Sequence, residues 1–84
     1  MSYEVLIEKS AEKKLSKIPQ NYKRNISDAI SNLAENPRPS GCKKLKGRPA
    51  WRIRVGIYRV IYKISDRQLI ITVIDVGHRK DIYR

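Results

Sequence analysis

The chain has 84 residues, and its 19 Lys and Arg against 8 Asp and Glu give a formal net charge of +11. This length predicts one small domain, residues 1–84, with one modest hydrophobic core. Cys42 is the single cysteine, which excludes an intrachain disulfide, and no stretch approaches the ~20 apolar residues of a membrane span. The opening MSYEVLIEKS lacks the pattern of a signal peptide, so we expect a cytoplasmic protein with no membrane partner.

The first half of the chain predicts one strand followed by two helices. Residues 3–8 alternate between two faces, which is typical of a strand. Ser10 is the expected N-cap of a first helix, which Pro19 ends. A second helix follows, ended by Asn36-Pro37. Its apolar stripe has five members: Tyr22, Ile26, Ala29, Ile30 and Leu33. Because little more than a turn separates the helices, they predict an αα-hairpin.

The second half of the chain predicts strands. The segment CKKLKG favours a short edge strand, because lysines protect an exposed edge from further pairing. Residues 50–55 and 58–64 each alternate between two faces, and residues 69–76 are apolar on both faces, as in a central strand. The order β-α-α-β-β-β-β therefore predicts an α+β fold. We expect the two helices to pack on a mainly antiparallel sheet of four to five strands.

Three arginines lie close together in the stretch WRIRVGIYRV. Gly56-Ile57 between two strands is typical of a two-residue type II′ turn, which would pair Arg54 with Arg59 and place Arg52 on the same face. Directly opposed like charges are destabilising, so folding alone does not favour this arrangement. Arginines splayed into water are one interpretation. We favour an anion site, for a nucleic-acid backbone or an acidic peptide, because guanidinium groups suit phosphate and carboxylate.

The surroundings of these arginines support that interpretation. Residues 36–65 contain nine basic residues and no acidic one. Four of the basic residues precede the arginine-rich stretch and are candidate contacts to a polyanion such as RNA: Lys43, Lys44, Lys46 and Arg48. A strongly positive surface attracts polyanions and accelerates their encounter. The chain has no Cys/His metal spacing, no Gly-rich phosphate loop and no apparent Ser-His-Asp constellation, so we expect no metal site.

The last nine residues, VGHRKDIYR, add further candidates. His78 is the only histidine, and imidazole exchanges protons near neutral pH, although a lone histidine is more often a packing residue. Arg79 adds a cation at the end of the expected central strand. Tyr83 is placed either to stack on a nucleobase or to pack the chain end. The chemistry indicated is phosphate chemistry on arginine, with His and Tyr as candidate helpers.

Four segments, in this order and spacing, resemble the RelE/ParE superfamily of toxins from type II toxin–antitoxin systems: YEVLIEKSAEKKLSKIP, NPRPSGCKKLKG, WRIRVGIYRVIYKI and VIDVGHRKDIY. The resemblance covers essentially the whole chain and is closer to the RelE branch. It implies an mRNA interferase that cuts mRNA in the ribosomal A site through attack of the ribose 2′-hydroxyl on the adjacent phosphate, without a metal or cofactor. It also implies contact with rRNA, an acidic RelB-like antitoxin, and operator DNA only through the antitoxin complex.

The resemblance implies roles for single residues. Arg59 matches the family arginine that binds the phosphate, and Arg79 matches one assigned to transition-state charge or to the leaving group. Tyr83 matches the terminal tyrosine that stacks against the substrate base. Arg52 and Arg54 stand where the best-known RelE pattern has two lysines, one of them the proposed base.

That departure leaves the proton acceptor open, because a guanidinium stays protonated and is a poor base. Either Arg54 only stabilises charge, or another group accepts the proton, for which His78 is the natural candidate. Two other functions stay open at this point. One is a ParE-like gyrase inhibitor without RNA chemistry, and the other is a basic module that only binds its antitoxin.

Overall fold

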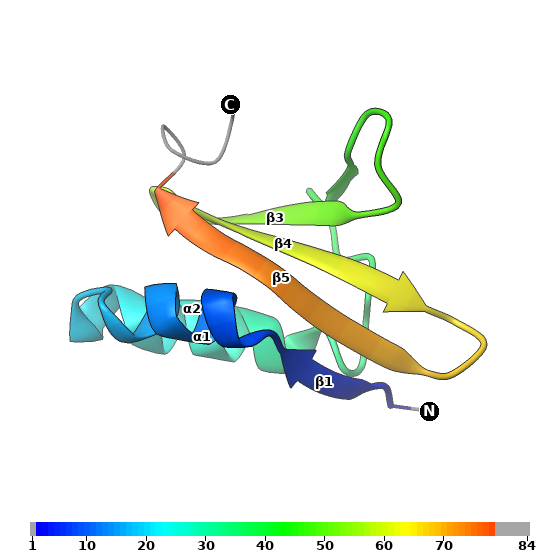
Figure 1. The fold of residues 1–84 in the computed structure, drawn as a ribbon, viewed down its shortest axis with the longest axis horizontal. Helices are drawn as coiled ribbons and strands as arrows, with labels where there is room; N and C mark the ends of the chain where they lie inside the picture. The colour runs from blue at the N-terminus through cyan, green and yellow to red at the C-terminus, as the bar shows by residue number, and fades with distance from the viewer. Residues whose placement is uncertain (1, 79–84) are drawn as a thin grey trace.

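The computed structural model describes residues 2–78 and has the predicted element order β-α-α-β-β-β-β. Two helices are followed by most of the sheet, and Figure 1 shows both helices against the same face of it. The α+β prediction is therefore confirmed. The bounds are β1 (Glu4–Ile7), α1 (Lys9–Ser16), α2 (Gln20–Asn32), β2 (Lys43–Lys44), β3 (Trp51–Val55), β4 (Tyr58–Ser65) and β5 (Ile70–His78).

The sheet has five strands in the order β1-β5-β4-β3-β2. Neighbouring strands are antiparallel except β1 and β5, which pair in parallel from Glu4–Ile70 to Ile7–Val73. The sheet is thus mixed, although mainly antiparallel as predicted. β5 lies between β1 and β4, so it is a central strand as predicted, and β2 is the short edge strand that the lysines predict.

The first helix begins one residue after Glu8, and Ser10 is its second residue rather than its cap. The reason is the strand before it. The N–H of Glu8 donates to the carbonyl of Val73 at 2.9 Å, which continues the pairing with β5, and the carbonyl of Glu8 accepts from the N–H of Glu12. The end of β1 therefore fixes where α1 begins, and the predicted Ser10 cap is wrong. Pro19 does precede α2 directly, as expected.

The hydrophobic core lies between the helices and one face of the sheet. Its buried members come from both layers: Ala11, Ile26, Ile30, Leu33, Ile53, Val60, Tyr62, Ile71, Val73 and Val76. Tyr62 is the largest fully buried side chain, and its hydroxyl donates to the carbonyl of Pro37 at 2.7 Å. Burial raises the pKa of the Tyr62 phenol because its ionised form would lose its hydration. The core thus anchors the segment that leads from α2 to β2.

Candidate functional site

The β3–β4 hairpin has the register predicted from its turn. Val55 pairs with Tyr58 across the two-residue turn, and Gly56 has φ +63°, in the left-handed region that glycine tolerates best. Arg54 then pairs with Arg59, and Arg52 pairs with Ile61. Because side chains in a strand alternate between faces, Arg52, Arg54 and Arg59 share one face, as predicted. We call these three residues the arginine cluster.

The arginine cluster lies on the face of the sheet opposite the helices. Tyr58 packs against Tyr22 of α2, with ring centroids 5.4 Å apart, so Tyr58 faces the helices and the next residue, Arg59, faces away from them. Arg59 is 3% exposed and Arg52 is 8% exposed, whereas Arg54 is exposed. A guanidinium group is planar and offers several donors in a fixed geometry, which suits phosphate recognition.

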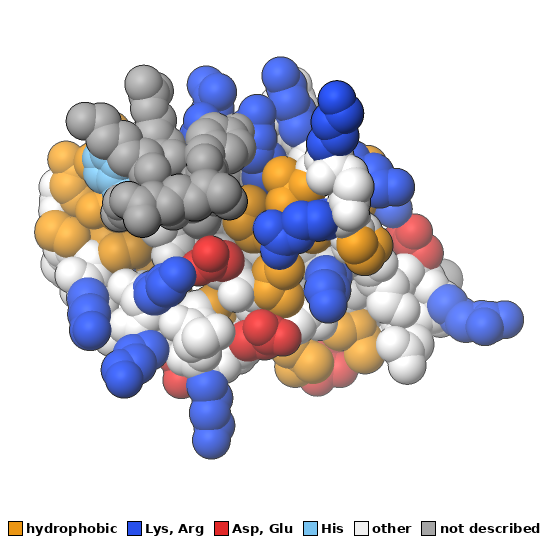
Figure 2. Space-filling view, turned by 45° about the horizontal axis from the view of Figure 1, so that its top comes forward, with side chains coloured by type: hydrophobic (Ala, Val, Ile, Leu, Met, Phe, Trp, Pro, Cys, Tyr) orange, Lys and Arg blue, Asp and Glu red, His pale blue; other side chains and the backbone are white. Residues whose placement is uncertain are grey.

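Lys43 extends the arginine cluster toward the sheet edge. It pairs with Arg52, whereas Lys44 pairs with Trp51 and so belongs to the other face. Lys46 and Arg48 are exposed in the connection between β2 and β3. Figure 2 shows Lys and Arg side chains gathered along the top of the molecule, near the end of the sheet that carries β2 and β3, with Asp and Glu lower in the view. Of the four predicted RNA contacts, the structure brings Lys43 to the cluster.

His78 does not join the arginine cluster. It pairs with Tyr58, and the centroids of the two rings lie 6.0 Å apart, so His78 shares the helix-facing side. The cross-strand partner of Arg59 is Gly77 instead. The reason is a β-bulge in β5: Ile61 pairs with Asp75 while Tyr62 pairs with Val73, which places one extra residue in β5 and reverses the alternation beyond it. The predicted site residues Arg79 and Tyr83 lie outside the described residues.

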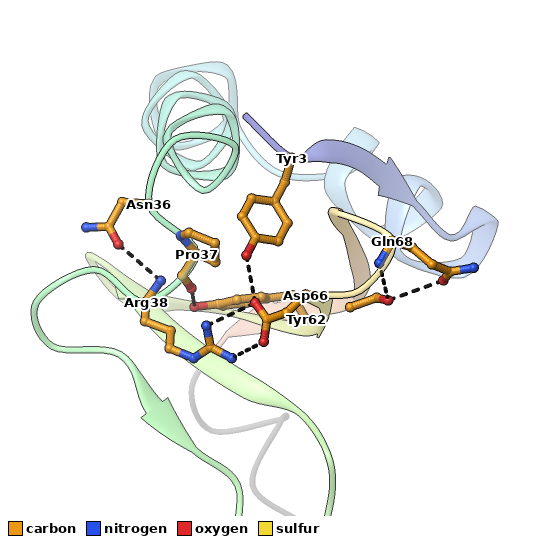
Figure 3. A network of polar contacts seen from close by, with 8 residues as sticks. Tyr3, Asn36, Pro37, Arg38, Tyr62, Asp66 and Gln68 are labelled. Atoms are coloured by element: carbon orange, nitrogen blue, oxygen red, sulfur yellow. Dashed lines mark hydrogen bonds and ion pairs between the residues drawn. The ribbon is translucent and has the colours of Figure 1, made fainter. Parts of the chain in front are cut away.

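A polar network that the sequence did not indicate supports the basic segment before β2. Asp66, in the β4–β5 turn, accepts a hydrogen bond from the Tyr3 hydroxyl at 2.6 Å and binds Arg38 through both carboxylate oxygens, at 3.3 and 2.9 Å. The Arg38 guanidinium also lies 5.0 Å from the centroid of the Trp51 ring. Figure 3 shows Tyr3, Arg38 and Asp66 converging from three segments. No local pattern links residues this far apart, so sequence reasoning missed them.

This network makes the stability of the protein depend on pH. The hydrogen bonds from Arg38 and then Tyr3 lower the pKa of Asp66, because they favour its ionised form. A lowered pKa contributes stability above the unfolded value of about 4, which is lost as pH falls through the folded pKa. We therefore expect Asp66→Asn to lower the urea midpoint at pH 7, with a smaller difference from wild type at pH 3.

Asp28→Asn, on the exposed surface of α2, is the matched control because it removes the same charge. An Asp66→Asn variant whose deficit in urea midpoint is the same at both pH values would contradict the role of the ionised carboxylate.

Residues 2–78 contain no group of three His, Cys, Asp or Glu side chains placed to bind one metal ion. The same residues include no helix long and apolar enough to cross a membrane.

The sequence matches a protein family over nearly its whole length. The family described as "ParE toxin of type II toxin-antitoxin system, parDE" matches residues 5–83. The chain therefore belongs to the RelE/ParE superfamily of type II toxin–antitoxin toxins. Toxin RelG of Mycobacterium tuberculosis is 32% identical over 87 residues, which cover 100% of this chain and 99% of RelG. Putative toxin RelE1 of Methanocaldococcus jannaschii is 30% identical, covering 100% and 98% of the two chains.

Solved structures agree with this assignment. The archaeal RelE–RelB complex from Pyrococcus horikoshii contains a chain that matches with a TM-score of 0.84 and 29% identity, covering 94% of this chain and 97% of that one. The intact RelBE toxin–antitoxin complex of Escherichia coli matches with a TM-score of 0.81 and 25% identity, covering 92% and 96%. The fold and the family thus agree with the resemblance carried by the sequence motifs.

Proposed function

We propose that this toxin is a metal-independent endoribonuclease that cleaves mRNA in the ribosomal A site and so inhibits translation. The observation that carries the proposal is the arginine cluster, in which Arg54 directly opposes Arg59 and Arg52 is almost buried beside them. Like charges stand here in direct cross-strand register, and guanidinium groups gathered in this way suit an anionic ligand such as a phosphate. The names of the relatives RelG and RelE1 support the RelE branch of the superfamily, for which the sequence resemblance implies RNA as the ligand.

The proposed reaction is an internal phosphoryl transfer. The 2′-hydroxyl loses its proton as its oxygen bonds to the adjacent phosphorus, the bond from phosphorus to the 5′-oxygen breaks, and the 5′-oxygen takes up a proton. The products are a 2′,3′-cyclic phosphate and a 5′-hydroxyl. The arginine cluster would bind the non-bridging oxygens, whose charge grows in the transition state. Preorganised charge of this kind often accounts for most of an enzyme's rate. Arg79 is proposed to serve the leaving group and Tyr83 to stack on a base, both outside the described residues.

The placement of His78 argues against its role as the general base. It faces the helices, across the sheet from the arginine cluster. We therefore expect His78→Gln to cleave RNA at nearly the wild-type rate, measured by single-turnover cleavage on programmed ribosomes. If the variant instead loses the ~10²–10⁴-fold typical of a missing general base, while its circular dichroism stays that of wild type, then His78 reaches the reacting group.

The proposed partners follow from the same surface. Structures of related toxins contain RelB antitoxins, which supports an acidic RelB-like antitoxin for this chain. Its carboxylates would neutralise the cations that otherwise bind RNA. Lys44, Lys46 and Arg48 are proposed to contact mRNA or rRNA, and operator DNA would be reached only through the antitoxin complex. With these partners, the proposed location of the toxin is the cytoplasm.

A second function is favoured by the description of the matching family, which names ParE rather than RelE. A ParE-like toxin would inhibit gyrase and leave RNA intact. The deciding experiment is primer extension on a translated mRNA after induction of the toxin, run beside a gyrase supercoiling assay. New 5′ ends within codons with unchanged supercoiling support the endoribonuclease. Intact mRNA with inhibited supercoiling would replace it by the ParE-like function, and no effect in either assay would leave only antitoxin binding.

A further inference from the structure

Lys43 extends the arginine cluster, and the strand that carries it is only two residues long. Within residues 2–78, β2 pairs with β3 at Lys43–Arg52 and Lys44–Trp51 and at no other position. This strand is shorter than most strands of globular proteins, so its own pairing holds it weakly. The position of Lys43 beside the cluster therefore depends on what holds the chain before and after β2.

The two sides of β2 are held differently. After β2, the N–H of Leu45 donates to the carbonyl of Ala50 at 2.8 Å, which ties the chain to the start of β3. Before β2, residues 39–41 line a hollow of ≈ 480 Å³ beside β3, so this stretch has little packing on that side. Its position is set by its two ends, where Cys42 packs against the core and Arg38 is held by its side chain.

Arg38 is held from two directions. Its guanidinium donates to both carboxylate oxygens of Asp66, at 3.3 and 2.9 Å, and lies 5.0 Å from the centroid of the Trp51 ring. Asp66 is fixed in turn, because it accepts a hydrogen bond from the Tyr3 hydroxyl at 2.6 Å (Figure 3). An exposed ion pair alone contributes little, but a two-pronged pair inside a network holds its side chains in one geometry.

Trp51 connects this contact to the arginine cluster. It is the first residue of β3, it pairs with Lys44, and it directly precedes Arg52. Asp66 itself is remote from the cluster. It follows the last residue of β4, whereas Arg59 is the second residue, which separates the two by ~20 Å along the strand. Any effect of Asp66 on a ligand of the cluster must therefore pass through Arg38.

We propose that Asp66 is a positioning residue for Lys43: by holding Arg38 against Trp51, it fixes the chain that presents Lys43 beside the arginine cluster. This role rests on the proposed function, because the ligand that Lys43 meets there is the RNA backbone. The direct electrostatic effect of the Asp66 carboxylate on RNA is repulsion. Positioning has the opposite sign, so the two effects can be told apart.

The test is binding of the toxin to programmed ribosomes whose mRNA has a 2′-deoxynucleotide at the cleavage position, so that affinity is measured without cleavage. Asp66→Asn is expected to weaken binding about fivefold, the net contribution of one intramolecular hydrogen bond, although it makes the protein more positive. Asp28→Asn, at an exposed position of α2, makes the same change in charge and should bind at least as tightly as wild type.

A double-mutant cycle decides whether the effect passes through Lys43. Lys43→Gln alone should weaken binding, and adding Asp66→Asn to it should cause no further loss, because the residue being positioned is already gone. Arg38→Lys keeps the charge but loses the two-pronged contact, so it should weaken binding as Asp66→Asn does. Urea unfolding checks that every variant is folded under the conditions of the binding assay.

Either of two results would overturn this role: Asp66→Asn binds as tightly as Asp28→Asn, or the losses of Asp66→Asn and Lys43→Gln add. The primer-extension assay separates the role of Asp66 from the proposed function. A toxin that cleaves mRNA while the two losses add removes the role of Asp66 alone. A toxin whose losses are coupled but that cleaves no mRNA overturns the proposed cleavage alone, and a wild-type toxin that does not bind programmed ribosomes overturns both.

Discussion

Arg59→Met is expected to lower the rate of RNA cleavage by about 10²–10³-fold, the usual cost of removing one preorganised group that stabilises transition-state charge. Arg59 is 3% exposed and is the second residue of β4, so methionine, which has a similar length, should keep much of its packing. The expected loss is therefore a loss of charge and of the planar donors. Single-turnover cleavage on programmed ribosomes measures the rate, and growth arrest after induction gives an independent measurement.

Arg24→Met is the matched control, because Arg24 is an exposed arginine of α2 on the other layer. It removes the same charge and should cleave RNA at the wild-type rate. Urea unfolding of both variants checks that they are folded. An Arg59→Met toxin that is folded and cleaves as fast as Arg24→Met would show that the arginine cluster does not contact the scissile phosphate.

Arg54→Glu is expected to change activity and stability in opposite directions. It replaces two directly opposed positive charges by a pair of opposite charges, Glu at position 54 and Arg59. A cross-strand pair of opposite charges stabilises a sheet by roughly 0.2–1 kcal/mol, whereas directly opposed like charges destabilise it. The free energy of unfolding should therefore rise by about that amount. A carboxylate beside the phosphate should at the same time lower cleavage by about 10²-fold or more. Urea denaturation and single-turnover cleavage measure the two effects.

Arg67→Glu makes the same change in net charge at an exposed position of the β4–β5 turn and is the control for general electrostatics. If both variants gain stability equally, relief of the overall charge of +11 explains the gain. If Arg54→Glu has a lower free energy of unfolding than wild type, the directly opposed arginines do not destabilise the fold.

Much of the fold was predictable because its signals are local. Strand alternation and the apolar stripe of α2 need only the spacing between nearby residues. The strands and the helix form where predicted, although α2 ends at Asn32 and not at Asn36-Pro37. The Ser10 cap failed because a distant contact, between Glu8 and Val73, extends β1 and fixes the start of α1. The network around Asp66 could not be found at all, since it joins segments that are far apart in the sequence.

By itself the sequence determined the arginine cluster, because a two-residue turn at Gly56-Ile57 fixes the register of the hairpin around it. Only the tertiary structure decided where His78 points. Strict alternation from Val73, which faces the core, would have put His78 on the face of the arginines. The bulge opposite Ile61 and Tyr62 adds one residue to β5 and turns His78 toward the helices, and a strand that is apolar on both faces carries no sequence signal for that shift.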